Sequence, residues 1–98
     1  MATYVSLINF TDQGVRTFTD TVDRVEAAKK LATKMGGRLK EVYWTLGPWD
    51  VVAVSDAPDD ETATAFALAL GAQGNIRTTT LRAFDAAEMK GIIAKATA

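Results

Sequence analysis

The chemistry open to this chain is limited by two residue types that it lacks. Its 98 residues include no cysteine and no histidine. Without cysteine there are no thiol nucleophiles, disulfides or thiolate metal sites. Without histidine the chain lacks the commonest general base, metal ligand and axial haem ligand. Acid–base chemistry would therefore fall to carboxylates, and we expect neither a metal nor a cofactor.

The turn Gly47-Pro48-Trp49-Asp50 is the first place where side chains could do chemistry. Asp50 could accept a proton, and Trp49 could stack on a planar ligand. The same residues also make a structural turn, in which Gly47 takes an unusual backbone angle, Pro48 fixes the next one and Asp50 bonds turn amides. Both interpretations stay open, and the structural one is simpler.

Side-chain hydroxyls on the predicted strands form a second group of candidates. They could line a cavity and orient a small molecule by hydrogen bonds, or hold water at an interface between two copies. Arg82 and Glu41 are expected to share one sheet face and to pair there. The candidate ligand-binding residues are Tyr4, Ser6, Tyr43, Thr45, Trp49, Asp50, Thr78 and Arg82.

The elements that would position these residues follow from hydrophobic spacing and turn residues. Strands are predicted at 3–10, 38–46, 51–55 and 75–84, and residues 11–14 read as a turn. Helices are predicted after Asp20, from the Pro58 region, and after Asp85, where Glu88 completes a capping box. The order β-α-β-β-α-β is the ferredoxin-like, or split βαβ, arrangement. Residues 1–98 therefore form one α+β domain with an added C-terminal helix.

In this fold both long helices lie on one face of the sheet and leave the other face bare. Strand alternation predicts that the helices cover Val5, Leu7, Val42, Trp44, Leu46, Val52, Val54, Leu81 and Ala83. The bare face would then show Tyr4, Ser6, Ile8, Phe10, Glu41, Tyr43, Thr45, Val51, Ala53, Ser55, Thr78, Thr80, Arg82 and Phe84. An apolar patch of this kind marks an interface, so we expect a homodimer with a cavity between its two sheets.

The composition of the chain limits the classes of partner that it could bind. The net charge is −1 and charged residues make up 23% of the chain. This balance gives no electrostatic footprint for nucleic acid, and no apolar run is long enough to cross a membrane. We expect a cytoplasmic protein, since the start of the chain lacks the features of a signal peptide.

The run from Tyr43 to Val52 resembles the signature of the GYD domain family. The turn 11–14, the segment 57–61 and the stretch 74–84 are similar to further parts of that family. The resemblance extends from about Tyr4 to Phe84, with Trp49 in place of the tyrosine that gives the family its name. It implies a fold akin to the dimeric α+β barrel proteins, and no assigned activity.

Two functions remain open at this stage. The first is a homo-oligomeric module for small-molecule binding or assembly, with a partly apolar ligand. The alternative is a cofactor-independent monooxygenase or isomerase of the dimeric α+β barrel type, in which Asp50 or Glu41 would serve as the base.

Overall fold

A computed structural model describes all 98 residues and contains one four-stranded antiparallel sheet. The strands are β1 (Ala2–Phe10), β2 (Arg38–Trp44), β3 (Val51–Ala57) and β4 (Ile76–Ala83). Their order across the sheet is β2-β3-β1-β4, with the first and third strands of the chain in the middle. This order confirms the predicted ferredoxin-like α+β fold.

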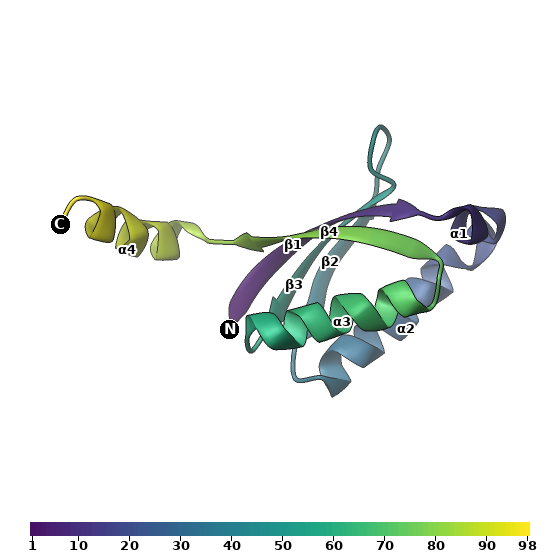
Figure 1. Cartoon of the computed structure of the whole chain (residues 1–98), viewed down its shortest axis with the longest axis horizontal. Coiled ribbons are helices and arrows are strands. Elements are labelled where there is room, and N and C mark those ends of the chain that lie inside the picture. The colour runs from purple at the N-terminus through teal and green to yellow at the C-terminus, as the bar shows by residue number, and fades with distance from the viewer.

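Two long helices cover one face of the sheet: α2 (Thr21–Lys34) and α3 (Asp60–Ala72) (Figure 1). Asp59 caps α3 by accepting a hydrogen bond from the Thr62 amide at 2.7 Å. Bonds from the Thr62 side chain and amide lower the pKa of Asp59. Both helices therefore begin near the predicted positions.

The segment after β1 is a short helix rather than the predicted turn. It consists of α1 (Asp12–Arg16) and a single 3-10 turn, η1 (Phe18–Asp20). The Thr11 hydroxyl accepts a hydrogen bond from the Gly14 amide and caps α1. Gly14 packs so closely that a Cβ atom there would lie 1.9 Å from the Asn75 carbonyl oxygen. Only glycine therefore allows α1 to seat against the start of β4.

The structure reverses the predicted faces of three strands. Tyr4 and Ile8 are 4% and 8% exposed, and they point toward the helices together with Val51 and Ala53. The bare face instead carries Val5, Leu7, Val52, Val54, Leu81 and, as predicted, Tyr43. Only β2 has the predicted faces, with Val42 and Trp44 on the helix side, but it ends at Trp44 and Leu46, which was also expected beneath the helices, is fully exposed in the loop.

Strand pairing explains this reversal. Val42 pairs with Ala53, and cross-strand partners always share a face. If the Val42 side chain faces the helices, the Ala53 side chain must therefore face them too. In β1 both faces carry apolar residues, so alternation alone could not choose between them.

The last helix, α4 (Ala86–Ala96), projects away from the rest of the molecule (Figure 1). The predicted capping box is present: the Asp85 carboxylate accepts from the Glu88 amide, and the Glu88 carboxylate accepts from the Asp85 amide. Met89 and Ile93 on its apolar stripe are exposed. No helix in the structure is long and apolar enough to cross a membrane.

Asp50, in the loop between β2 and β3, has a structural role, but its carboxylate bonds an amide of β1 rather than the turn amides expected from the sequence. The Asp50 carboxylate accepts a hydrogen bond from the Phe10 amide at 2.8 Å, and the Asp50 amide donates to the Ile8 carbonyl. Gly47 takes a φ of +114°, which favours glycine. Asp50 thus joins the loop to the end of β1.

Replacing Asp50 with alanine should lower the free energy of unfolding by about 1–2 kcal/mol, because the Phe10 amide loses its acceptor. Urea denaturation measures this change. Glu26→Ala is the matched control: the carboxylate is exposed on α2 and pairs only with the exposed Lys29, so the expected change is below about 0.5 kcal/mol. Equal losses in the two variants would contradict the clamp assigned to Asp50.

Candidate functional site

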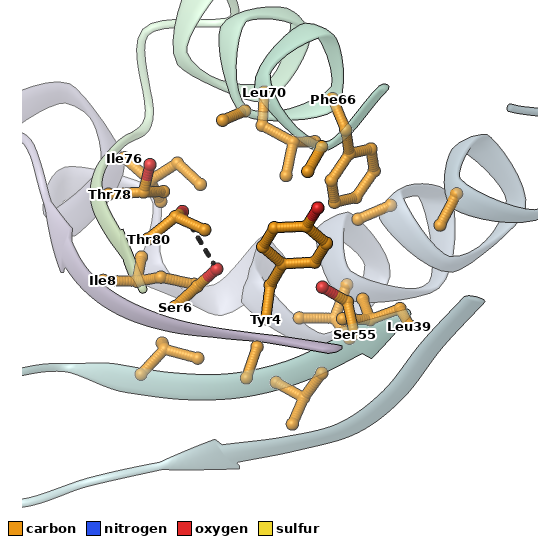
Figure 2. A pocket seen from close by; sticks show the side chains of 18 of the residues that line it. Tyr4, Ser6, Ile8, Leu39, Ser55, Phe66, Leu70, Ile76, Thr78 and Thr80 are labelled. Atoms are coloured by element: carbon orange, nitrogen blue, oxygen red, sulfur yellow. Dashed lines mark hydrogen bonds between the residues drawn. The ribbon is translucent and has the colours of Figure 1, made fainter. Parts of the chain in front are cut away.

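A cavity of about 100 Å³ lies between the sheet and the two long helices. Its walls are mainly apolar, with Phe66 and Leu70 of α3 on one side and Ile8 of β1 on the other (Figure 2). Only eight of the 98 residues are buried, and no large side chain is less than 2% exposed. The helices therefore cover the sheet without filling the space beneath them.

Several hydroxyl groups interrupt the apolar walls of the cavity. Ser6 of β1 and Thr80 of β4 are cross-strand partners whose hydroxyls lie 3.2 Å apart. Thr78 and Ser55 also face the cavity (Figure 2). Hydroxyls can both donate and accept hydrogen bonds, so this wall can hold the polar part of a small molecule or bound water.

Tyr4 stands in the middle of the cavity and points its hydroxyl toward the helices (Figure 2). That hydroxyl donates a hydrogen bond to the Asp60 carboxylate at 2.5 Å. The bond to Asp60, followed by burial, raises the pKa of Tyr4. The tyrosine therefore stays protonated and acts as a hydrogen-bond donor rather than as a base.

The cavity opens toward a shallow depression between α3 and β4. Tyr4, Thr78 and Thr80 line both spaces, and the depression adds Asp60, Thr64 and Arg82 at its rim. This depression is the mouth of the cavity.

Arg82 is engaged on several sides at the mouth. Its guanidinium lies 4.5 Å from the centre of the Phe84 ring and 5.7 Å from that of Tyr4. It also donates to the Thr3 and Ala83 carbonyls and reaches Glu88 of α4 at 3.5 Å. The expected pair with Glu41 is absent, because Glu41 lies on the bare face.

Four of the predicted site residues thus come together: Tyr4, Ser6, Thr78 and Arg82. The other four lie elsewhere. Tyr43 is on the bare face and its hydroxyl donates to Glu41, whereas Thr45 donates to the Trp49 carbonyl inside the loop. This cavity lies within one chain. A cavity between the two sheets of a dimer stays a prediction.

The sequence reasoning missed Asp60, Ser55 and Phe66 as parts of the site. In the sequence Asp60 is one of several acids at the start of a predicted helix, a place where negative charge favours the helix dipole. Its bond to Tyr4 could be predicted only once Tyr4 had been placed beneath the helices. No group of acidic, histidine or cysteine side chains has the spacing of a metal site.

Fold and site together define a small ferredoxin-like α+β domain with an internal, partly polar cavity. The model of the GYD domain family matches residues 4–93 of the chain, and the protein therefore belongs to this family.

Two similar proteins come from Thermus thermophilus. The chain is 33% identical over 90 residues to the "Glutamine synthetase and cystathionine beta-lyase binding protein", covering 91% of this chain and 95% of the relative. It is also similar to the crystal structure of TTHA0845, with a TM-score of 0.57 and 27% identity. That match covers 88% of this chain and 96% of the other.

The raised pKa of Tyr4 predicts a specific loss of stability in alkali. The folded state holds the Tyr4 proton more tightly than the unfolded state does. The contribution of this difference to the free energy of unfolding is complete below about pH 10, the ordinary pKa of tyrosine. It is lost as the pH rises through the pKa of Tyr4 in the folded state. Tyr4→Phe should remove this fall and cost about 1 kcal/mol at neutral pH.

Urea midpoints across this alkaline range test the prediction. Tyr43→Phe is the matched control, since it removes a tyrosine from the bare face and should keep the wild-type fall. Parallel profiles for wild type and Tyr4→Phe throughout the range would show that the Asp60 bond does not hold the proton.

Proposed function

We propose that the protein is a non-catalytic binding module that holds a small, partly apolar molecule in the cavity between its sheet and helices. The observation that carries this proposal is the unfilled cavity with the Ser6–Thr80 hydroxyl pair in its wall. Apolar space with a few placed polar groups is the usual composition of a small-molecule site. The Thermus relative is named as a protein that binds two enzymes, which supports a binding role over catalysis without specifying a small molecule.

The alternative of a cofactor-independent enzyme finds less support. It relied on Asp50 or Glu41 as the base. Asp50 holds the Phe10 amide, and Glu41 accepts from the Tyr43 hydroxyl on the bare face. Neither carboxylate lines the cavity. A base must lie within hydrogen-bond reach of the proton that it removes.

We also propose that two copies pair through their bare sheet faces into a homodimer, which could be the unit of a higher homo-oligomer. Four strands of about seven residues present roughly 450 Å² in projection. With side-chain relief this approaches the about 600 Å² per partner at the lower end of specific interfaces. Its apolar centre consists of Val5, Leu7, Val52 and Val54, and Asp56, which pairs with Lys40, follows on the same face of β3. A two-fold contact would pack this patch against its own copy.

We place the protein in the cytoplasm, since a chain without cysteine fits a reducing compartment.

Filling the cavity should abolish ligand binding. Ala53 is 5% exposed on the cavity wall, so Ala53→Leu places a larger side chain in the space. Native mass spectrometry of the wild type should find a retained small molecule, or thermal shift should register added pentanol, and the variant should show neither. Ala87→Leu makes the same change on exposed α4 and should behave as wild type.

Ala53→Leu could also overpack the core, at a cost of about 1–3 kcal/mol. Thr80→Val therefore serves as a second variant, because it keeps the volume and removes one hydroxyl, and it should weaken binding. A wild type with no retained molecule and no response to pentanol would refute the cavity function.

The proposed dimer predicts that a charge at the centre of the bare face gives monomers. Leu7→Lys should convert a dimer to a monomer in sedimentation equilibrium at micromolar concentration. Leu68→Lys, on the exposed side of α3, should leave the dimer intact. A wild-type chain that sediments as a monomer would rule out this mode of pairing.

A further inference from the structure

Two opposite charges lie at the mouth of the cavity without pairing with each other. Asp60 begins α3 and Arg82 stands near the end of β4, and both line the depression of about 420 Å³ that forms this mouth. They form no ion pair with each other. A space between opposite, unpaired charges suits a molecule that carries both signs of charge.

Tyr4 connects the two sides of the mouth. Its hydroxyl donates to the Asp60 carboxylate at 2.5 Å, and the Arg82 guanidinium lies 5.7 Å from the centre of its ring. Both charges therefore lie against the same tyrosine, and the gap between them is too wide for a direct ion pair but within reach of one small molecule. An α-amino acid carries its ammonium and carboxylate groups on one carbon atom and can bond both sides of such a gap.

The Asp60 carboxylate has free acceptor sites. An ionised carboxylate can accept about four hydrogen bonds, and this one accepts only the bond from Tyr4. Thr64, one turn later, donates its hydroxyl to the Asp60 backbone carbonyl and not to the carboxylate. The remaining acceptor sites suit an ammonium group, which has only donors.

The Arg82 guanidinium also has donors to spare. Its Nη1 atom is bound to the Thr3 and Ala83 carbonyls, but no hydrogen bond engages Nε. Nη2 reaches Glu88 of α4 at 3.5 Å, a long contact between partly exposed side chains, and such pairs contribute little. A ligand carboxylate can therefore bond Nε and Nη2 together, in the two-pronged geometry that arginine favours.

An apolar lining continues from the mouth into the cavity. Ala63 and Ala67 of α3 line both spaces, together with Tyr4, Thr78 and Thr80. The inner space of about 100 Å³ is smaller than the about 150 Å³ that holds benzene. It therefore accepts only a side chain much smaller than benzene, such as the isopropyl group of valine.

We propose that the mouth binds a free α-amino acid with a small aliphatic side chain. Its ammonium group bonds Asp60 and its carboxylate bonds Arg82, while its side chain points into the cavity. This inference rests on the proposed small-molecule function and names the class of ligand. The mouth lies on the helix side of the sheet, so pairing through the bare face leaves it accessible.

Isothermal titration calorimetry with three molecules of the same branched skeleton tests the proposal. L-Valine carries both charges, 3-methylbutanoate lacks the ammonium group and 2-methylpropylamine lacks the carboxylate. Valine should bind the wild type about ten-fold more tightly than either analogue, because each analogue loses one charged hydrogen bond. L-Phenylalanine should bind more weakly than valine, since its ring is too large for the inner space.

The two site variants should each change a different affinity ratio. Asp60→Asn keeps an acceptor for the Tyr4 hydroxyl but removes the charge, so the ratio of valine affinity to 3-methylbutanoate affinity should fall toward one. Arg82→Gln should instead lower the ratio of valine affinity to 2-methylpropylamine affinity. A loss of stability alone would weaken all three molecules together and leave both ratios unchanged.

Two matched controls change the same charges outside the mouth. Glu61→Gln removes the next acid of α3, and Arg77→Gln removes an exposed arginine of β4. Neither residue lines the mouth, so both ratios should stay at their wild-type values. An equal fall in the control variants would assign the preference to the overall charge of the protein and overturn the inference.

The outcomes separate this inference from the small-molecule function beneath it. Valine that binds no more tightly than its two analogues would overturn the amino-acid inference, while a retained molecule or a response to pentanol would still support the cavity function. If valine, its analogues and pentanol all fail to bind, both proposals fail. Ratios that Asp60→Asn and Arg82→Gln leave unchanged would place the amino acid elsewhere and overturn the proposed site.

Discussion

One cross-strand row of this sheet determines which side chains face the helices. The row consists of Val42, Ala53, Ser6 and Thr80. Cross-strand partners share a face, so placing one member of the row places the other three and, by alternation, most of each strand. The row in turn depends on the loop that pairs Trp44 with Val51. A shift of one residue in that pairing would turn Val42 and Trp44 of the edge strand away from the helices and remove Val42 from the cavity wall.

Two hydrogen bonds of Asp50 stabilise this strand register. Its carboxylate binds the Phe10 amide, and its own amide binds the Ile8 carbonyl, so the loop between β2 and β3 is tied to the central strand. A residue that sequence reasoning offered as a base is thus part of the scaffold. The Asp50 carboxylate therefore supports the geometry of the cavity although it does not line it.

The element order could be predicted because hydrophobic period, glycines and caps all point the same way, as at Asp59 and Asp85. The faces could not be assigned by alternation alone, because Val5 and Leu7 are as apolar as Tyr4 and Ile8. The pairing of Val42 with Ala53 was the missing constraint. The bond between Tyr4 and Asp60 was beyond sequence reasoning, since it joins residues whose closeness follows only from the packed helices.

The incompletely filled interior gives the domain a mechanical property. A folded chain that encloses empty space occupies more volume than the same chain unfolded in water, where that space is lost. Hydrostatic pressure therefore acts against the folded state in proportion to the void, and a molecule that occupies the cavity opposes it. The space of about 100 Å³ beneath the helices is therefore expected to make unfolding of this domain more sensitive to pressure when the space is unoccupied than when a ligand fills it.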